Sequence, residues 1–566
     1  MPEVAESPHV LTATGGPASA LELKPAEAAR SAGAGGGVRA GARLVWAVIP
    51  CFNRPADLAL VLEDLTALDL TTGAVHAARH TSGSGAQPHA PAGGSDATGA
   101  EHARAAGWGV HLKIVVVDNA SATPLSAMKV PAGLDLAFLR LNQNTGGAGG
   151  YNAGMAYALG EGKRLGTPPE FVWLVDSDVR LEAPALRGLI DCLDARPDAV
   201  AAGSAIADMQ DASIFEVGGR VERIWGQFGP RYGGENMPKT PVIECTYTAA
   251  CSALVRREAI EQTGLFPDVF LNADDVEWFI RMARVTGKKV LATTESVVRH
   301  PFFGRYATMP RYYMSRNSYG PLDALGLGWR VRLFRALRDV PRAVAQIMIG
   351  RDDLAELHLK GMEHAAQRLQ GPAPAGTIEF ERPRAFETLA ETLRPMLAKL
   401  GLPGATTRAG GAGKSAGKTA EVYLHKRVVL PLAKADELHR QLAMLGLSAA
   451  RIQRGFFNVE HEKMLHGFWL AMWRVFIAGP TADVALIHAR GRPMAWCRGR
   501  VQVVISQDGY VIRELDRGGS LKRGWRAFWR GVRAAWRVAM RQPAALGLSP
   551  LPRAEELAAR LPAMTA

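Results

Sequence analysis

The sequence predicts an α/β fold in which helices cover both faces of a mostly parallel sheet. Three observations support this prediction. Short apolar runs, typical of strands buried on both faces, alternate with segments of helical spacing over residues 41–185. These runs end in polar residues such as Asp, Asn and Ser, which turns favour. Finally, 48% of the 566 residues are hydrophobic, so the chain can bury a large core in two or three domains.

Four apolar runs and two segments of helical spacing make up the first part of this fold. The strands are expected at 44–50, 112–117, 136–141 and 171–175, and the helices at 55–68 and near 151–160. From 185 to 300 the alternation loosens into an α+β pattern, and helices dominate 309–400.

Shifts in composition divide the chain into domains and connecting segments. Stretches rich in Ala, Gly, Ser or Pro, without a helical or strand period, predict a tail, a surface insertion and a linker. We expect a disordered tail at 1–40, an α/β domain at 41–320 with a flexible insertion at 73–107, a helical extension at 321–402, a linker at 403–420, and a small α+β carboxyl-terminal domain at 421–566.

The balance of charge and the cysteines restrict the partners and the compartment. The formal net charge of +13 indicates an anionic partner, which can be a nucleotide, an acidic lipid surface or a nucleic acid. The five cysteines include no CxxC pair, which favours a reduced, cytoplasmic compartment. We find neither a secretory signal nor an uncharged apolar run of about 18 residues, so we expect no spanning helix.

The strand that ends at Val175 leads directly into Asp176-Ser177-Asp178. On an extended segment, residues i and i+2 share a face, so two carboxylates lie together there. Carboxylate oxygens are the ligands that Mg²⁺ and Mn²⁺ prefer, and such a metal can bridge the phosphates of a nucleotide. A capped turn explains one such motif equally well. Because polar residues follow all four strands at the same edge, we favour a ligand site.

Several motifs, taken in order, resemble the catalytic domain of family 2 glycosyltransferases with the GT-A fold. The resemblance covers residues 44–320, and its motifs are Val48-Ile49-Pro50-Cys51-Phe52-Asn53-Arg54, Val115-Val116-Val117-Asp118-Asn119, the DXD motif Asp176-Ser177-Asp178, and Asn272-Ala273-Asp274-Asp275-Val276-Glu277-Trp278. The glycine-rich stretch 144–151 is similar to the branch that holds bacterial galactofuranosyltransferases and rhamnosyltransferases.

The resemblance implies a role for each matching residue. It places Pro50, Phe52, Arg54, Asp118, Asn144, Gly147, Asp176 and Ser177 at the nucleotide-sugar donor, Asp176, Asp178 and His300 at a Mn²⁺ or Mg²⁺ ion, Asp275 at the catalytic base, and Tyr247 and Asp274 at the acceptor. His300 can also be structural, Tyr247 can equally pack in the core, and Asp274 can cap the helix that follows it.

The physical chemistry of these positions agrees with the implied roles. Inversion at an anomeric carbon needs a base opposite the leaving group, and a carboxylate near the acceptor hydroxyl can serve. The amino terminus of the helix that begins at Asp274 and Asp275 is expected to keep Asp275 ionised. The following cluster of Tyr, Arg and Asn residues, 311–317, either closes over the diphosphate or packs the helix.

The resemblance therefore predicts a metal-dependent, inverting hexosyltransferase. Its expected donors are UDP-galactofuranose and dTDP-rhamnose, and its expected acceptor is a hydroxyl of a cell-envelope glycan or lipid-linked glycan in bacteria. Galactofuranan polymerases carry a β-rich domain before the catalytic one, whereas residues 1–40 of this sequence are expected to be a low-complexity tail. Two alternatives stay open: a nucleotidyltransferase that acts on sugar phosphates, and a non-catalytic scaffold at the membrane.

The carboxyl-terminal region contains an expected basic amphipathic helix at 521–541. Aromatic residues and arginines recur at helical spacing on neighbouring faces. Such a helix can lie in an anionic membrane surface, or it can dock on its own domain. No nucleic-acid-binding module is recognisable, so we expect no nucleic acid as partner. We expect a cytoplasmic protein, peripheral on the inner face of the cell membrane.

Overall fold

The computed structural model of the chain describes most of the elements that the sequence predicts. The described residues are 43–70, 109–301, 309–348, 350–377, 383–399, 422–424, 432–445, 482–488, 499–506, 509–514 and 517–542. The expected tail at 1–40, the insertion at 73–107 and the linker at 403–420 lie outside them.

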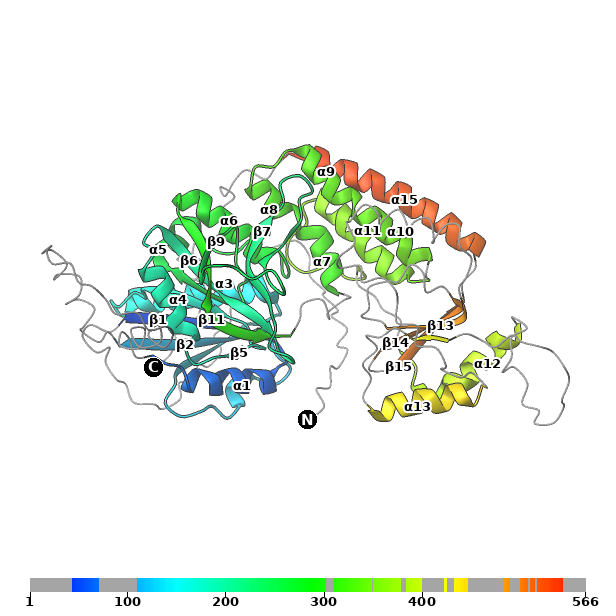
Figure 1. Cartoon of the computed structure of the whole chain (residues 1–566), viewed down its shortest axis with the longest axis horizontal. Helices are drawn as coiled ribbons and strands as arrows, with labels where there is room; N and C mark the ends of the chain where they lie inside the picture. Colours follow the sequence, from blue (N-terminus) through cyan, green and yellow to red (C-terminus); the bar gives the residue numbers. More distant parts are fainter. Residues whose placement is uncertain are drawn as a thin grey trace, which may run out of the picture.

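A mostly parallel sheet forms the core of the part of the molecule at left in Figure 1, which confirms the predicted α/β class. Its main path runs in the order β3-β2-β1-β4-β10-β6-β11-β5, where β10 and β5 are antiparallel to their neighbours and the other strands are parallel. The strands are β1 (Arg43–Cys51), β2 (Val110–Asp118), β3 (Asp135–Arg140), β4 (Phe171–Val175), β5 (Arg180–Leu181), β6 (Ala199–Asp208), β10 (Ser252–Arg256) and β11 (Lys289–His300).

Helices cover both faces of this sheet because its central strands are apolar on both faces. All five residues of β4 are buried, with alternate side chains entering two different hydrophobic clusters. On one face, α1 (Pro55–Thr66) and α4 (Ala185–Asp194) contribute their leucines, and the short helix at Leu125–Ala127 adds Leu125. On the other face lie α3 (Gly146–Arg164), α5 (Arg257–Thr263) and α6 (Asp274–Thr286).

Helix α3 begins at Gly146, five residues before the helix expected near 151–160. Glycine is a poor helix former, so the local sequence argued against a helix over the glycine-rich stretch. The structure shows that these glycines allow a close approach to the sheet. A Cβ atom on Gly150 would lie 2.7 Å from Cβ of Pro50, and one on Gly154 would lie 2.2 Å from Cγ1 of Val48. Tertiary packing therefore decides the start of this helix.

An antiparallel extension leaves the main path at β6. Strand β7 (Ile214–Val221) pairs with β6 and with β8 (Phe228–Tyr232), and β9 (Val242–Cys245) pairs with β11. These strands follow the loosened α+β pattern expected after residue 185.

Helices dominate the chain after residue 309, as predicted, and they form one packed group (Figure 1). They are α7 (Met309–Asn317), α8 (Tyr319–Ala324), α9 (Trp329–Leu337), α10 (Asp339–Met348) and α11 (Asp352–Ala366). The carboxyl-terminal helix α15 (Arg517–Met540) packs on α9, α10 and α11, far from it in sequence, through alanines such as Ala527 and Ala535. Among the described helices, none is both long and apolar enough to cross a membrane.

A second, smaller sheet lies beside this group of helices (Figure 1). Its strands are β12 (Val422–Leu424), β13 (Ala482–His488), β14 (Gly499–Ser506) and β15 (Gly509–Glu514), and α12 (Leu389–Lys399), α13 (Leu432–Ala443) and the short helix at Phe386–Thr388 pack with it. Four cysteines, Cys51, Cys192, Cys245 and Cys251, are buried free thiols, as expected for small packing residues.

Candidate functional site

The polar ends of β1, β2 and β4 meet at one edge of the sheet, as the parallel order predicts. Cys51 pairs with Asp118 in the register of β1 and β2, so their loops start side by side. Asn53 joins the two loops: its backbone N–H donates to Oγ of Ser121 (2.9 Å), and its Oδ1 accepts from the N–H of Ala122 (2.7 Å). The loops are therefore held together before any ligand binds.

Asp176, Asp178 and His300 form a cluster at this edge. One ligand atom from each of the three side chains lies within 4.8 Å of the others. Nε2 of His300 lies 3.6 Å from Oδ2 of Asp176 and 3.5 Å from Oδ1 of Asp178. The two acids follow β4, whereas His300 ends β11, so the fold unites residues that are more than a hundred positions apart.

The orientation of His300 fits a metal ligand. Its Nδ1 lies 2.7 Å from the carbonyl oxygen of Pro301, which can only accept, so Nδ1 carries the proton. Metal-binding histidines commonly make this second hydrogen bond, which fixes the ring and directs Nε2 at the ion. A set of two carboxylates and one imidazole suits Mn²⁺ or Mg²⁺.

The charges of the cluster reinforce one another. Burial by itself would lower the pKa of His300, but its hydrogen bonds to Asp176 and Asp178 raise that pKa to about 10. Burial opposes ionisation of Asp178, yet His300 and Arg54 together hold the pKa of Asp178 below its usual value. A divalent cation at the same place would replace the positive charge that His300 supplies.

Arg54 and Tyr151 contact the two acids from opposite elements. Arg54, next to β1, forms an ion pair with Oδ2 of Asp178, and its side chain remains 38% exposed. The Tyr151 hydroxyl, on α3, donates to Oδ1 of Asp176 at 2.6 Å. Tyr151 was absent from the predicted site residues, because only the close packing of α3 against the sheet brings it to Asp176.

Asp118 is buried and bonded to its own loop. Its Oδ1 accepts a hydrogen bond from the N–H of Ser121 (2.8 Å), and its Oδ2 accepts one from the N–H of Leu125 (3.0 Å). The same Oδ2 forms an ion pair with Arg140. Only 1% of the residue is exposed. Through these contacts Asp118 fixes the shape of the loop after β2, at which the resemblance places the donor.

Asn119 links the second strand to the glycine-rich segment, and it too was missing from the predicted site. Its Nδ2 donates to the carbonyl of Gly146 (2.9 Å), and its Oδ1 accepts from the N–H of Thr145 (2.8 Å). Asn144, a predicted donor-binding residue, accepts the N–H of Gly146 through its Oδ1 (2.9 Å). Together these amides fix the first turn of α3 at the sheet edge.

Four further predicted donor residues lie at the same edge. Pro50 is partly buried against Gly150, Phe52 is partly buried, and Ser177 is 8% exposed. Gly147 lies at the start of α3 opposite α6, since a Cβ atom built on it would come 4.0 Å from Oδ2 of Asp274. The amino termini of α3 and α6 therefore face each other across the site.

Asp274 and Asp275 form the first turn of α6. Oδ1 of Asp275 accepts the N–H of Val276 (2.7 Å), and its Oδ2 accepts the N–H of Ala250 (3.3 Å). Burial, followed by the mutual repulsion of the two acids, raises the pKa of Asp274. Burial also raises the pKa of Asp275 despite its backbone hydrogen bonds. The amino terminus of α6 was expected to favour ionised Asp275, but burial acts in the opposite direction and raises its pKa.

The loop before these acids is conformationally strained. Phe270, Asn272 and Ala273 have φ angles of 68°, 65° and 65°, a left-handed region that costs a non-glycine residue about 1 kcal/mol or more. Nδ2 of Asn317 lies 3.0 Å from the carbonyl of Val269 and 2.7 Å from that of Leu271. Asn317 therefore holds the strained loop in place.

The cluster at 311–317 thus packs the loop before α6. The guanidinium of Arg316 donates to the carbonyls of Val269 (2.8 Å) and Gly371 (2.7 Å), and the ring of Tyr313 stacks on Phe270 with ring centroids 5.2 Å apart. Of the two readings of this cluster from sequence, packing is the one that these contacts support.

Tyr247 and Glu216 lie on the side of the site formed by the antiparallel extension. Tyr247 is 5% exposed and its ring covers Gly219, as in the core-packing alternative. Glu216, in β7, is 6% exposed, and burial together with the charge of Asp275 raises its pKa to about 8. The sequence signal for Glu216 is a single acid inside an apolar strand.

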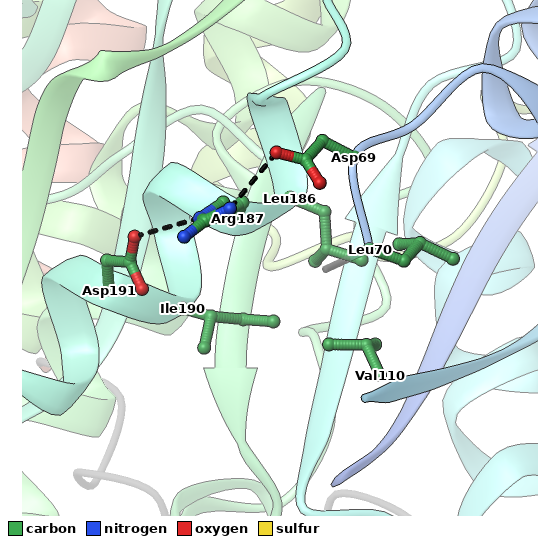
Figure 2. A pocket seen from close by; sticks show the side chains of 7 residues that line it. All are labelled: Asp69, Leu70, Val110, Leu186, Arg187, Ile190 and Asp191. Carbon is green, nitrogen blue, oxygen red and sulfur yellow. Dashed lines mark hydrogen bonds and ion pairs between the residues drawn. The ribbon is translucent and has the colours of Figure 1, made fainter. Parts of the chain in front are cut away.

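A shallow depression elsewhere in the α/β part is unrelated to this edge. Figure 2 shows its lining, in which Arg187 pairs with Asp69 and Asp191 above the apolar side chains of Leu186 and Ile190. It lies at Val110, the first residue of β2, and so at the edge of the sheet opposite the candidate site.

Comparison with known proteins gives one family match. The family model described as glycosyl transferase family 2 matches residues 103–264. The matched segment contains Asp118, Asp176 and Asp178 and ends before Asp275 and His300. No curated protein matches the sequence.

Similar solved structures share little sequence with the chain. Residues 1–349 of TarS from S. aureus give a TM-score of 0.34 at 13% identity, with 57% of this chain and 80% of that chain covered. The same TarS segment with UDP-GlcNAc gives 0.36 at 13% identity, covering 63% and 86%. GalNAc-T7 with UDP, GalNAc and Mn²⁺ gives 0.34 at 12% identity, covering 54% and 51%.

Proposed function

We propose that the chain is a metal-dependent, inverting glycosyltransferase that uses a nucleotide diphosphate sugar as donor. The observation that carries this proposal is the Asp176–Asp178–His300 cluster, which lies at the same sheet edge as the partly buried acids at the start of α6. The glycosyl transferase family 2 match over residues 103–264 supports the same class of enzyme.

In this proposal, Asp176, Asp178 and His300 hold a divalent cation. When bound, Mn²⁺ or Mg²⁺ would offset the negative charge that develops on the departing diphosphate. Arg54, partly exposed beside Asp178, supplies a second positive charge for the phosphates. Tyr151 fixes the orientation of Asp176 through its 2.6 Å hydrogen bond. The nucleoside end of the donor is proposed to lie over the loops that Asp118, Asn144 and Ser177 shape.

Asp275 is the proposed general base. Inversion requires that the acceptor hydroxyl attack the anomeric carbon from the side opposite the diphosphate, while a base takes up its proton. The N–H groups of Ala250 and Val276 hold the two oxygens of Asp275 at a fixed angle. Its raised pKa makes the carboxylate a stronger proton acceptor than an exposed aspartate. Asp274 and Tyr247 remain proposed acceptor contacts.

The donor and acceptor are proposed from the glycine-rich motif. Its similarity to bacterial galactofuranosyl- and rhamnosyltransferases favours transfer of a hexose from UDP-galactofuranose or dTDP-rhamnose. The acceptor is then a hydroxyl of a cell-envelope glycan or lipid-linked glycan, and the protein acts on the cytoplasmic side of a bacterial cell membrane.

A donor screen tests this function. We expect UDP-galactofuranose or dTDP-rhamnose with Mn²⁺ to raise the thermal midpoint of the protein, because a ligand that binds only the folded state stabilises it. Excess EDTA should remove this shift, and donor hydrolysis should require the metal. Stabilisation and turnover by nucleoside triphosphates, with none by nucleotide sugars, would instead support a nucleotidyltransferase.

A further inference from the structure

Helix α15 leaves one of its faces uncovered. Its buried face consists largely of alanines, including Ala527, Ala534 and Ala535, which pack on α9, α10 and α11. Large apolar side chains point the other way. Trp525 is 62% exposed, Trp536 55% and Trp529 45%. Large apolar side chains are usually buried, and an exposed apolar patch on a folded protein often marks a binding surface. The exposure of three tryptophans on one helix therefore indicates such a surface.

Four arginines in the middle of α15, Arg526, Arg530, Arg533 and Arg537, divide into two groups. Arg530 turns inward and pairs with Glu356 (2.8 Å) and Glu363 (2.6 Å) on α11. Arg526, Arg533 and Arg537 are exposed. Within the described part of the chain, the side chains of these three arginines form no ion pair or hydrogen bond. Arg530 therefore helps to dock the helix, whereas the other three leave their charges at the surface.

The exposed tryptophans and arginines form two parallel rows. At about 100° per residue, Trp525, Trp529 and Trp536 fall within about 40° of one another around the helix axis, and Arg526, Arg533 and Arg537 do the same about 80° away. The helix contains no acidic residue between Arg517 and Met540 to neutralise the basic row. A row of indoles beside a row of arginines runs along a helix of 24 residues.

We propose that this face of α15, the Trp–Arg face, binds an anionic lipid surface. Indole rings favour the boundary between headgroups and acyl chains, since they have an apolar body and one N–H donor. Arginines beside them can contact lipid phosphates at the same depth. A basic surface for nucleic acid would not need three exposed tryptophans in a row on a rigid helix.

Docking of α15 strengthens this inference. An isolated amphipathic helix would place its apolar residues on one face and fold only at the membrane. Here the alanine face and Arg530 already fix the helix on the protein, so the Trp–Arg face is formed before any lipid is met. Membrane binding would then hold the whole molecule in one orientation at the surface.

Sedimentation of the full-length protein with vesicles tests the proposal. We expect binding to vesicles of phosphatidylcholine with phosphatidylglycerol and little binding to phosphatidylcholine alone. The triple variant Arg526→Gln/Arg533→Gln/Arg537→Gln should lose about a hundredfold in binding to the anionic vesicles, because each basic residue near such a surface contributes roughly a factor of five. The variant Trp525→Ser/Trp529→Ser/Trp536→Ser should bind more weakly than wild type even at low salt.

The matched control removes three exposed arginines from other surfaces: Arg164→Gln/Arg220→Gln/Arg440→Gln. It has the same net charge as the first variant and should bind anionic vesicles within about twofold of wild type. Equal loss in both arginine variants would show a mere net-charge effect and overturn the proposal. The proposal is also overturned if the wild-type protein does not bind anionic vesicles. Binding of duplex DNA in place of the vesicles is one form of this result. Thermal midpoints near that of wild type show that each variant is folded.

Discussion

His300 is the residue through which the metal site depends on the tertiary fold. It comes from β11, whereas both acids follow β4, and its Nδ1 is fixed on Pro301. We predict that His300→Ala weakens Mn²⁺ binding at least about tenfold, since it removes a ligand. Titration with Mn²⁺ monitored by electron paramagnetic resonance measures this. The control variant Glu261→Gln, which changes an exposed acid, should leave the Mn²⁺ affinity unchanged. Equal Mn²⁺ affinities in wild type, His300→Ala and Glu261→Gln would exclude His300 as a ligand.

The raised pKa of Asp275 predicts the pH dependence of the reaction. A general base must be ionised, so activity is present above the pKa of Asp275 and is lost as the pH falls through it. Burial shifts this pKa upward. The acidic limb of kcat/KM should therefore lie well above the value of about 3.9 of a free aspartate. A pH profile measured at saturating metal checks this, and a limb near the ordinary value would contradict the assigned environment.

Single residues of the site differ in how far the sequence reveals them. Asp176 and Asp178 stand out because two acids follow a buried strand at spacing i, i+2. Tyr151 and Asn119 do not, because each belongs to the site only through an approach between distant elements. No local pattern encodes such an approach.

At the scale of elements, the loop before α6 depends on α7 for its shape. Three non-glycine residues of this loop have left-handed backbone angles. The side-chain amide of Asn317, on α7, donates hydrogen bonds to two of the loop carbonyls. We assign Asn317 a positioning role for Asp275, which lies three residues after Asn272.

We predict that Asn317→Ala lowers kcat about tenfold or more while Mn²⁺ affinity stays within about twofold. Loss of the hydrogen bonds, each worth about 1 kcal/mol, lets the strained loop relax and moves Asp275, but the metal cluster lies on other elements. Steady-state kinetics and Mn²⁺ titration on the same preparation separate the two effects. Gln210→Ala, an exposed amide, is the control. Parallel losses of kcat and Mn²⁺ affinity would indicate general unfolding and contradict the positioning role.

The elements also show where sequence patterns suffice. The apolar runs predicted all four early strands, because a strand buried on both faces has a composition that few other structures share. The start of α3 was mispredicted, because the poor helix propensity of glycine is outweighed there by its close fit against Pro50 and Val48. Propensity is local, whereas this packing is decided across the sheet.

At the scale of the whole molecule, α15 returns to helices that precede it by more than 150 residues. The sequence predicted the helix and placed its aromatic residues and arginines on neighbouring faces. The structure shows that the face packed on the protein consists largely of alanines and that Arg530, which is partly exposed, pairs with α11. The partners of Arg530 on α11, Glu356 and Glu363, lie more than 150 residues before it, so the sequence of α15 alone does not indicate them.

This arrangement predicts different effects for two neighbouring arginines. Arg530→Gln breaks two ion pairs that are only partly exposed, so it should lower the thermal midpoint by about 1–3 °C without weakening vesicle binding. Arg526→Gln, at an exposed position, should leave the midpoint unchanged. Differential scanning fluorimetry on the two variants measures this, and identical midpoints would argue against docking through Arg530.

In the proposed reaction the metal cluster and Asp275 have separate roles: the cluster binds the diphosphate, and Asp275 takes up the acceptor proton. Asp275→Asn keeps the size of the side chain but removes the charge that accepts the proton. We predict that turnover with the donor identified in the screen falls about 10²–10⁴-fold, as loss of a general base generally does, while the thermal shift produced by UDP and Mn²⁺ stays as in wild type. Asp274→Asn is the control for removal of a neighbouring, partly buried acid and should retain more activity. Turnover of Asp275→Asn within a few-fold of wild type, in protein that still binds UDP and Mn²⁺, would contradict the account.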